Sequence, residues 1–149
     1  MFAEVEMCNP IVELIRGTKA CKKCYDLGRG YLLKQTGKTS NACARVASEY
    51  LVAAGEITKK FVSTRGLSDH LIDHYNYEVV LYVDELQPGD VIFTADMRGK
   101  RGWPDHVCIC YSVTGKTVMV LDNYSPLPKV RNMQKGRRTA FGWALRKPE

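Results

Sequence analysis

The chain has 149 residues, the length of one domain of ordinary size, and such a chain can bury roughly 70% of its unfolded surface without disulfides or a structural metal. Hydrophobic residues make up 45% and charged residues 26% of it, which excludes a disordered or fibrous chain. The 22 lysines and arginines exceed the 16 acidic residues, so the net charge is +6 and an anionic neighbour is expected: nucleic acid, a membrane surface or an acidic cell-wall polymer.

The N-terminus lacks the signals that direct a chain out of the cell. Residues 1–7 carry two acids and no base, and no long apolar stretch follows them, so neither a secretory signal nor a membrane span is expected. We therefore expect a protein that is made in the cytoplasm and stays there unless something else exports it. Free thiols in a reducing compartment are expected of its six cysteines, which are Cys8, Cys21, Cys24, Cys43, Cys108 and Cys110.

The first half of the sequence predicts helices. Asn9-Pro10 opens a short helix that ends near residue 17, and a second helical stretch covers residues 19–33. The most regular pattern runs over residues 42–55 and follows a polar loop in which Ser40 or Asn41 can act as the helix cap. A further short helix is expected over residues 67–75. The apolar positions of the regular helix fall on one face: Cys43, Val46, Ala47, Tyr50 and Leu51.

The second half has the pattern of strands and turns. Helices followed by an antiparallel meander define the α+β class. We expect one domain over residues 1–149, helical to about residue 76 and built of β-sheet from about 77 to 146. Strands are predicted over residues 79–83, 91–94, 106–113, 117–121 and 139–145, with a turn at 87–90 and a hairpin turn at 112–116.

Cys43 is a candidate nucleophile because it lies in the first turn of the helix over residues 42–55. Unpaired backbone N–H groups and the positive end of the helix dipole favour a thiolate there, although a buried structural cysteine would also fit. A nucleophile needs a base and a group that orients the base. His106 opens a strand, and Asp122-Asn123 end the next one, so they come alongside His106 if the hairpin pairs in simple register. This is the papain-type order of cysteine, histidine and carboxylate or amide.

Asp122 and Asn123 compete for the third role. Adjacent residues of a regular strand point to opposite faces, so only one of them can face His106. Asp122 is preferred, because a carboxylate both orients the imidazole and stabilises its positive charge. An amide only orients the ring, and Asn123 stays the alternative.

Several segments in this order resemble the NlpC-like and CHAP-like cysteine peptidases of the papain-fold superfamily. Residues 41–55 are similar to the family's nucleophile helix, and Tyr31 matches a tyrosine near the oxyanion site of NlpC-like members. In the family, Ser-Gly usually follows the cysteine, whereas Ala44-Arg45 follow it here. The third polar residue of NlpC-like members is usually a histidine; Asp122-Asn123 at this position are more similar to CHAP-like enzymes. The Pro-Gly-Asp turn, the histidine strand and the closing strand are matched by residues 86–93, 105–109 and 141–146.

The resemblance implies a papain-like core, with N-terminal helices packed on an antiparallel sheet or half-barrel. It also implies a cysteine hydrolase that cleaves an amide bond in peptidoglycan, as an endopeptidase or an amidase, without a metal or other cofactor. A phage lysin, a virion wall hydrolase, an injected effector and an intracellular peptidase would all fit. The implied catalytic residues are Cys43, His106 and Asp122 (or Asn123), the oxyanion contacts Tyr31 and the N–H of Cys43, and the substrate contacts Trp103 and Asp105.

Other features leave alternatives open. The segment 129–138 is either a solvated loop or a patch that contacts an anionic cell-wall polymer, and a non-catalytic polyanion-binding module is the rival to the enzyme. Nucleic acid is not favoured, because no helix-turn-helix, zinc-finger or RNP-type signature is present. An acyltransferase on the same fold is a third possibility. The basic residues of the segment are Lys129, Arg131, Lys135, Arg137 and Arg138.

Two sequence pairs have metal-ligand or redox spacing. Cys21 and Cys24 form a CxxC without a second pair at zinc-ribbon spacing, so structural thiols are expected. His70 and His74 have the i, i+4 spacing of two metal ligands but lack the glutamate of a zincin, so a polar helix face is expected there.

Overall fold

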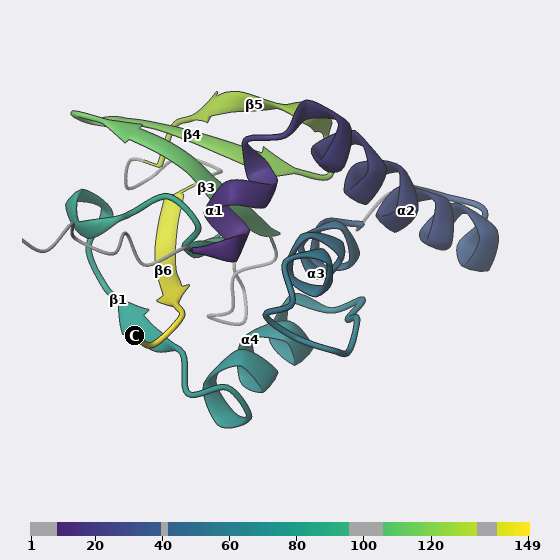
Figure 1. The fold of residues 1–149 in the computed structure, drawn as a ribbon, viewed down its shortest axis with the longest axis horizontal. Coiled ribbons are helices and arrows are strands. Elements are labelled where there is room, and N and C mark those ends of the chain that lie inside the picture. Colours follow the sequence, from purple (N-terminus) through teal and green to yellow (C-terminus); the bar gives the residue numbers. More distant parts are fainter. Residues whose placement is uncertain (1–8, 40–41, 96–105, 134–139) are drawn as a thin grey trace, which may run out of the picture.

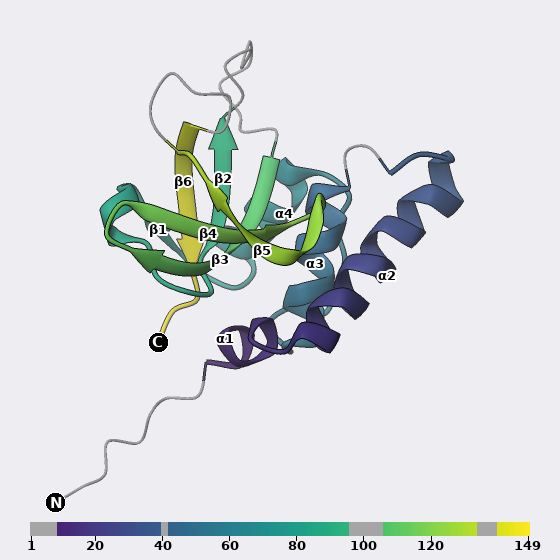
Figure 2. The same ribbon diagram turned by 90° about the horizontal axis from the view of Figure 1, so that it is seen from above.

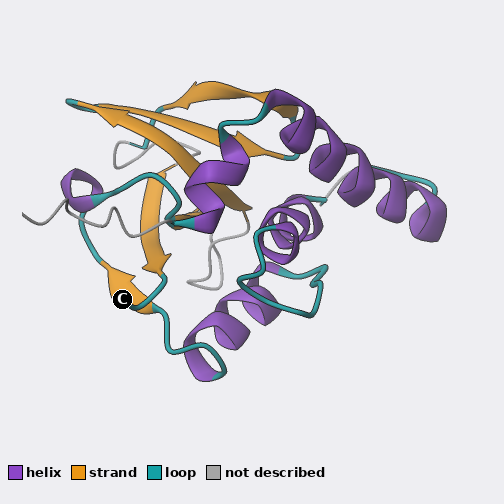
Figure 3. Cartoon of the chain, in the orientation of Figure 1, coloured by secondary structure: helices purple, strands orange, loops and turns teal. Residues whose placement is uncertain are grey.

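The computed structural model describes residues 9–39, 42–95, 106–133 and 140–149. Figure 3 distinguishes its helices from its strands. The helices come first: α1 (Pro10–Ile15), α2 (Thr18–Thr36), α3 (Cys43–Ala53) and α4 (Thr64–Asp73). The strands are β1 (Glu78–Val80), β2 (Val91–Ala95), β3 (His106–Thr114), β4 (Thr117–Asp122), β5 (Ser125–Arg131) and β6 (Ala140–Arg146), with the 3-10 helix η1 (Val83–Glu85) after β1. This order confirms the predicted α+β class.

The strands form one antiparallel sheet in the order β1-β6-β2-β3-β4-β5. Strands β3 and β4 make the predicted hairpin, and Gly115 at its turn has a φ of +62°, which glycine adopts without steric cost. The sheet therefore has β1 at one edge and β5 at the other. Among the described residues, no helix combines the length and the apolar character that crossing a membrane requires.

The helix α3 lies between α2 and the sheet (Figures 1 and 2). Its predicted apolar face is buried, and Val46 and Tyr50 have no exposed surface. Gly28 of α2 packs on α3 so closely that a Cβ there would lie 2.7 Å from Cγ2 of Val46. This close approach explains why a glycine that weakens the helix stands in the middle of α2.

The strand β3 is buried on both faces. Val107 and Ile109 belong to the cluster that contains the helices, whereas Cys108 and Cys110 belong to a second cluster on the opposite face of the sheet. This division follows the two-residue alternation of a strand. The second cluster therefore lies on the face of the sheet away from α3.

Two parts of the strand prediction are wrong. The segment 79–83 forms a strand only over β1, and the chain then turns into η1. The strand β5 has no counterpart in the prediction, because Pro126 and Pro128 argue against a strand. Both prolines are tolerated because β5 is an edge strand, where a missing N–H breaks no ladder on the outer side.

The Pro88-Gly89-Asp90 turn fastens the start of β2 to the end of β6. Asp90 is buried and accepts two hydrogen bonds from Arg146, at 2.9 Å from Nε and 2.8 Å from Nη2. It also accepts the backbone N–H of Gln87 at 2.8 Å. The hydrogen bond to Asp90 raises the pKa of Arg146. In this chain, then, the aspartate of the turn has a structural role.

Candidate active site

Cys43 is the first residue of α3, and its position at the helix start agrees with the sequence pattern. Ala42 occupies the cap position and makes no side-chain cap bond; the expected caps Ser40 and Asn41 lie outside the described residues. Cys43 is 5% exposed. It packs in the same buried cluster as Val107, which follows His106, and Leu121, which precedes Asp122. The helix α3 therefore packs on β3 and β4, the two strands that carry His106 and Asp122.

His106 and Asp122 are joined directly. Nε2 of His106 lies 3.3 Å from Oδ2 of Asp122. An ionised carboxylate can only accept, so Nε2 carries the proton and donates it in this hydrogen bond. Nδ1 is then the imidazole nitrogen through which His106 can exchange a proton with a thiol or an amine.

A β-bulge in β3 places Asp122 on the same face as His106. Near the turn, Val113 pairs with Val118 and Ser112 with Met119, but beyond the bulge Cys110 pairs with Val120. The register shifts by one residue between Cys110 and Ser112, so Tyr111 is the extra residue. Without this insertion the alternation would turn the side chain at position 122 toward the opposite face. The simple register assumed for the hairpin is therefore wrong, and the contact depends on the irregularity.

Several groups besides His106 contact the side chain of Asp122. Its side chain is 0% exposed, with Lys129 Nζ at 3.6 Å and Arg131 Nη1 at 3.5 Å. It also accepts the backbone N–H of Tyr124 at 2.9 Å. Burial works to raise the pKa of Asp122, but the hydrogen bonds from His106 and Tyr124 and the charges of His106 and Lys129 outweigh it, and the net effect is a lowered pKa.

Asn123 faces away from this contact. It is buried, and its side-chain Oδ1 has no hydrogen-bond partner among the described residues. Its backbone carbonyl accepts a hydrogen bond from Arg29 Nη1 at 2.9 Å, which ties the end of β4 to α2. The geometry thus assigns the contact with His106 to Asp122 rather than to Asn123.

Tyr124 and the two basic residues of β5 are parts of the site that the sequence did not point to. The Tyr124 ring stacks on the imidazole of His106, with centroids 5.6 Å apart and planes 19° apart. Lys129 Nζ lies 4.8 Å from the centroid of the same ring. The spacing of Lys129 and Arg131 by two residues would have placed them on one face of a strand, but only if β5 had been recognised as a strand.

Lys129 and Arg131 do not lie in a loop. Both belong to β5 and approach a buried carboxylate, so the solvated-loop interpretation is wrong for them. The other basic residues of that segment, Lys135, Arg137 and Arg138, lie outside the described residues, as do Trp103 and Asp105.

Tyr31 lies on α2, and its ring is covered by the guanidinium of Arg45 at 3.6 Å from the centroid. Arg45 stands two residues after Cys43 on α3, so Tyr31 is near the start of that helix. Arg45 also approaches the buried Glu49 at 3.4 Å. Arg45 thus has a packing role between α2 and α3.

The remaining described cysteines are buried thiols. Burial raises the pKa of Cys24 to about 11 and that of Cys110 to about 12. It also raises the pKa of Cys21 and of Cys108, and the charge of a Cys43 thiolate is among the groups that raise the pKa of Cys108. Cys21 donates to the carbonyl of Ile15 at 3.1 Å, which is the behaviour of a structural thiol.

Neither the pair Cys21 and Cys24 nor the pair His70 and His74 has a third metal-ligating side chain beside it among the described residues. In the part of the chain that the structure describes, no three histidine, cysteine or acidic side chains come together in a way that could hold a metal. The imidazoles of His70 and His74 stack with centroids 4.8 Å apart and planes 7° apart. His70 also packs on Phe61 with centroids 4.7 Å apart.

Comparisons of the chain with models of protein families, with curated proteins and with solved structures found no match.

Proposed function

We propose that this protein is a cysteine hydrolase with a papain-like core, and that it cleaves an amide bond in peptidoglycan. The observation that carries the proposal is the hydrogen bond between His106 and the buried, ionised Asp122, beside the helix that begins at Cys43. A nucleophile, a base and an orienting group in this arrangement are what acyl transfer through a covalent intermediate needs.

In this mechanism Cys43 attacks the carbonyl carbon of the amide. His106 takes the thiol proton through Nδ1 and holds the thiolate as an ion pair, while Asp122 fixes the ring through Nε2. His106 then gives the proton to the leaving amine, and an acyl-enzyme remains on Cys43. Water, deprotonated by His106, releases the acid and restores the thiol.

The developing oxyanion needs hydrogen-bond donors and a positive potential. The backbone N–H of Cys43 lies in the first turn of α3, where the helix dipole is positive. Tyr31 is the second proposed donor, and the adjacent Arg45 adds a positive charge to this side of the site.

Peptidoglycan as the substrate is supported by the family resemblance and by the net charge of +6, since cell walls carry anionic polymers. A phage lysin, a virion wall hydrolase or an injected effector would meet this substrate. A role as a polyanion-binding module is weakened, because Lys129 and Arg131 are occupied with Asp122.

The test is to incubate the purified protein with peptidoglycans of several wall types and identify the soluble fragments by mass spectrometry. New amino termini within the stem peptides indicate an endopeptidase, and free lactyl groups on the glycan indicate an amidase. Cys43→Ser should abolish both, whereas Cys24→Ser, a buried thiol on α2, is the matched control and should stay active. Fragments released equally by Cys43→Ser, or none from any wall type by folded protein, would contradict the proposal. An acyl product on an added amine in place of the free acid would indicate an acyltransferase.

A further inference from the structure

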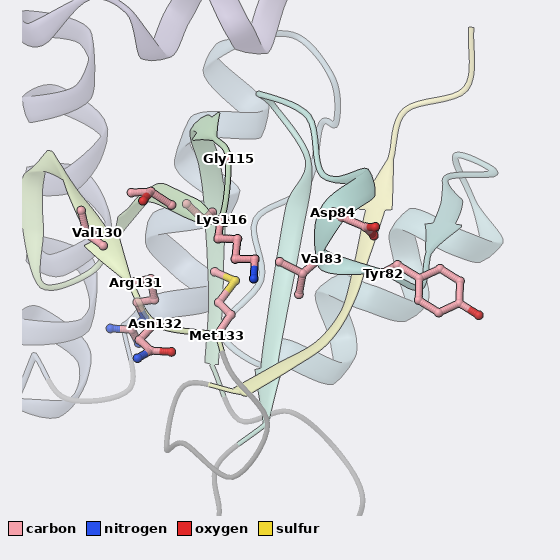
Figure 4. A pocket seen from close by; sticks show the side chains of 11 residues that line it. Tyr82, Val83, Asp84, Gly115, Lys116, Val130, Arg131, Asn132 and Met133 are labelled. Carbon is pink, nitrogen blue, oxygen red and sulfur yellow. The ribbon is translucent and has the colours of Figure 1, made fainter.

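A cavity lies beside the β3–β4 turn, and neither Cys43 nor His106 lines it. It has a volume of about 580 Å³ and is enclosed by η1, by the β3–β4 turn and by the end of β5 (Figure 4). Its apolar wall consists of Val83, Val118, Val130 and Met133. Small-molecule sites typically have volumes of about 300–1,000 Å³ and mostly apolar walls with a few polar groups. This cavity has the size and lining of such a site.

Lys116 supplies a positive charge to the cavity. It stands on the β3–β4 turn, and in Figure 4 its side chain reaches into the space between Met133 and Val83. No acidic side chain of the described residues lies within ion-pair distance of its amine. Asp84 also lines the cavity, but in Figure 4 its carboxylate points away from Lys116. An ammonium group without a counter-ion at an apolar wall favours an anionic partner.

Arg131 also lines the cavity, but its charge is already paired. Its guanidinium is engaged with Asp122 at 3.5 Å, and its Nε is buried without a hydrogen-bond partner among the described residues. Lys116 is therefore the positive charge of the lining that has no counter-ion among the described residues. One negative group on an otherwise apolar molecule would be complementary to it.

We propose that this cavity binds a small amphipathic carboxylate, such as a medium-chain fatty acid. Its carboxylate would pair with Lys116, and its alkyl chain would lie against Val83, Val118 and Met133. The proposed binding uses neither Cys43 nor His106, although Arg131 of the lining also contacts Asp122.

The experiment compares decanoate with nonyltrimethylammonium, which has the same nine-carbon alkyl chain and the opposite charge. Binding to the purified full-length chain is measured by calorimetry, and the methyl resonances of Val83, Val118 and Val130 locate the ligand. The wild-type protein should bind decanoate more tightly than the cation. Lys116→Met keeps the apolar stem and should weaken decanoate on the order of tenfold, the scale of one charge-assisted hydrogen bond. Lys116→Glu should reverse the preference between the two ligands.

Lys34→Met, an exposed lysine at the end of α2, is the matched control and should bind decanoate as the wild type does. Three results would overturn the proposal. The first is no binding of decanoate to the folded wild-type protein. The second is an equal affinity for decanoate in all three lysine variants and the wild type. The third is resonance shifts at the exposed Leu27 and Leu33 of α2 in place of the cavity methyls.

Discussion

Asp122 is a carboxylate without exposed surface that has three basic side chains within 4 Å: His106 at 3.3 Å, Arg131 at 3.5 Å and Lys129 at 3.6 Å. Burial of an isolated carboxylate would favour its neutral form. Here the hydrogen bonds and the positive charges keep the pKa below its usual value, so the group is charged at neutral pH. A charged Asp122 both orients the ring of His106 and stabilises an imidazolium.

Replacement of Asp122 should therefore affect turnover more than replacement of Asn123. We expect Asp122→Ala to lower turnover by about 10²-fold or more, because the base loses its orientation; in a serine triad the corresponding loss is roughly 10³ to 10⁴. Asn123→Ala should cost about tenfold or less, the scale of one supporting hydrogen bond. The measurement is the initial rate of fragment release from peptidoglycan.

Both variants must be folded, which near-UV circular dichroism shows. Asp122→Asn is the milder companion variant, since it keeps the shape and a carbonyl oxygen that can accept hydrogen bonds from Lys129 and Arg131. An inactive Asn123→Ala together with an active Asp122→Ala would transfer the third role to Asn123.

Cys43 should react first with an alkylating agent. All the described cysteines, Cys43 included, are buried, but burial raises the pKa of Cys21, Cys24, Cys108 and Cys110, so their thiolate fractions are small at neutral pH. Cys43 stands at the start of α3, where the helix dipole favours a thiolate. Limiting iodoacetamide at about pH 6, followed by peptide mapping, measures the order of labelling. Earlier labelling of Cys21 or Cys24 would contradict this prediction and indicate that the reactive thiol belongs to the CxxC of α2.

At the scale of elements, the hairpin of β3 and β4 shows what a sequence pattern can and cannot predict. The two strands and their turn follow from alternation and β-propensity. The face of the sheet on which Asp122 lies does not follow from these patterns. The extra residue Tyr111 shifts the pairing of β3 with β4 by one residue, which changes the face on which each later residue lies relative to its partner. The sequence favours Asp122 over Asn123 on chemical grounds alone. In the structure Asp122 does contact His106, but because of a bulge that no local sequence pattern predicts.

A related reason explains why the local sequence pattern does not predict the strand β5. Its composition, with two prolines, is typical of a loop, and only its position at the sheet edge makes a strand possible. Edge position is a property of the whole topology, which a local pattern does not contain. The sequence therefore predicts Lys129 and Arg131 in a solvated loop or an anion-contacting patch, whereas in the structure both approach Asp122.

The packing of α2 on α3 predicts opposite effects for two glycines of the same helix. A Cβ at Gly28 would lie 2.8 Å from the Cα of Val46, so Gly28→Ala should destabilise the protein by about 1–3 kcal/mol. A Cβ at Gly30 meets nothing within 4 Å, so Gly30→Ala should stabilise it by about 0.5–1 kcal/mol. Urea unfolding followed by circular dichroism measures both. Equal effects of the two substitutions would show that the close contact between α2 and α3 is absent in solution.

At the scale of the whole molecule, a few polar contacts join segments that are far apart in the sequence. Arg29 of α2 holds the backbone at Asn123, and Asp90 holds Arg146. Lys147 lies 2.8 Å from the buried Glu56, which follows α3. The first and the last of these contacts connect the helical half to the sheet, whereas the second lies within the sheet half. The contact of Arg29 is close in sequence to Asp122, which bonds to His106.

The buried carboxylate of Asp122 also couples the stability of the whole molecule to pH. Its pKa is lowered in the folded protein, so it adds stability above the pKa of the unfolded chain, and this contribution is lost as the pH falls through the folded pKa. Asp122→Asn removes the titrating group. We expect the wild-type protein to be the more stable of the two at about pH 5, and the difference in unfolding free energy to shrink as the pH falls toward about 2.

The measurement is the urea-unfolding free energy of both proteins at a series of pH values. The other carboxylates are the same in both proteins, so their contributions cancel in the difference. Asp69→Asn is the control, because the ion pair of Asp69 with Arg65 is exposed and such pairs contribute about 0–1 kcal/mol; its difference from the wild type should be small at every pH. If the difference between wild type and Asp122→Asn stays constant from about pH 5 to about pH 2, Asp122 does not have a lowered pKa in the folded protein. The electrostatic part of the proposed site would then have to be abandoned, because it requires Asp122 to be held in its charged form.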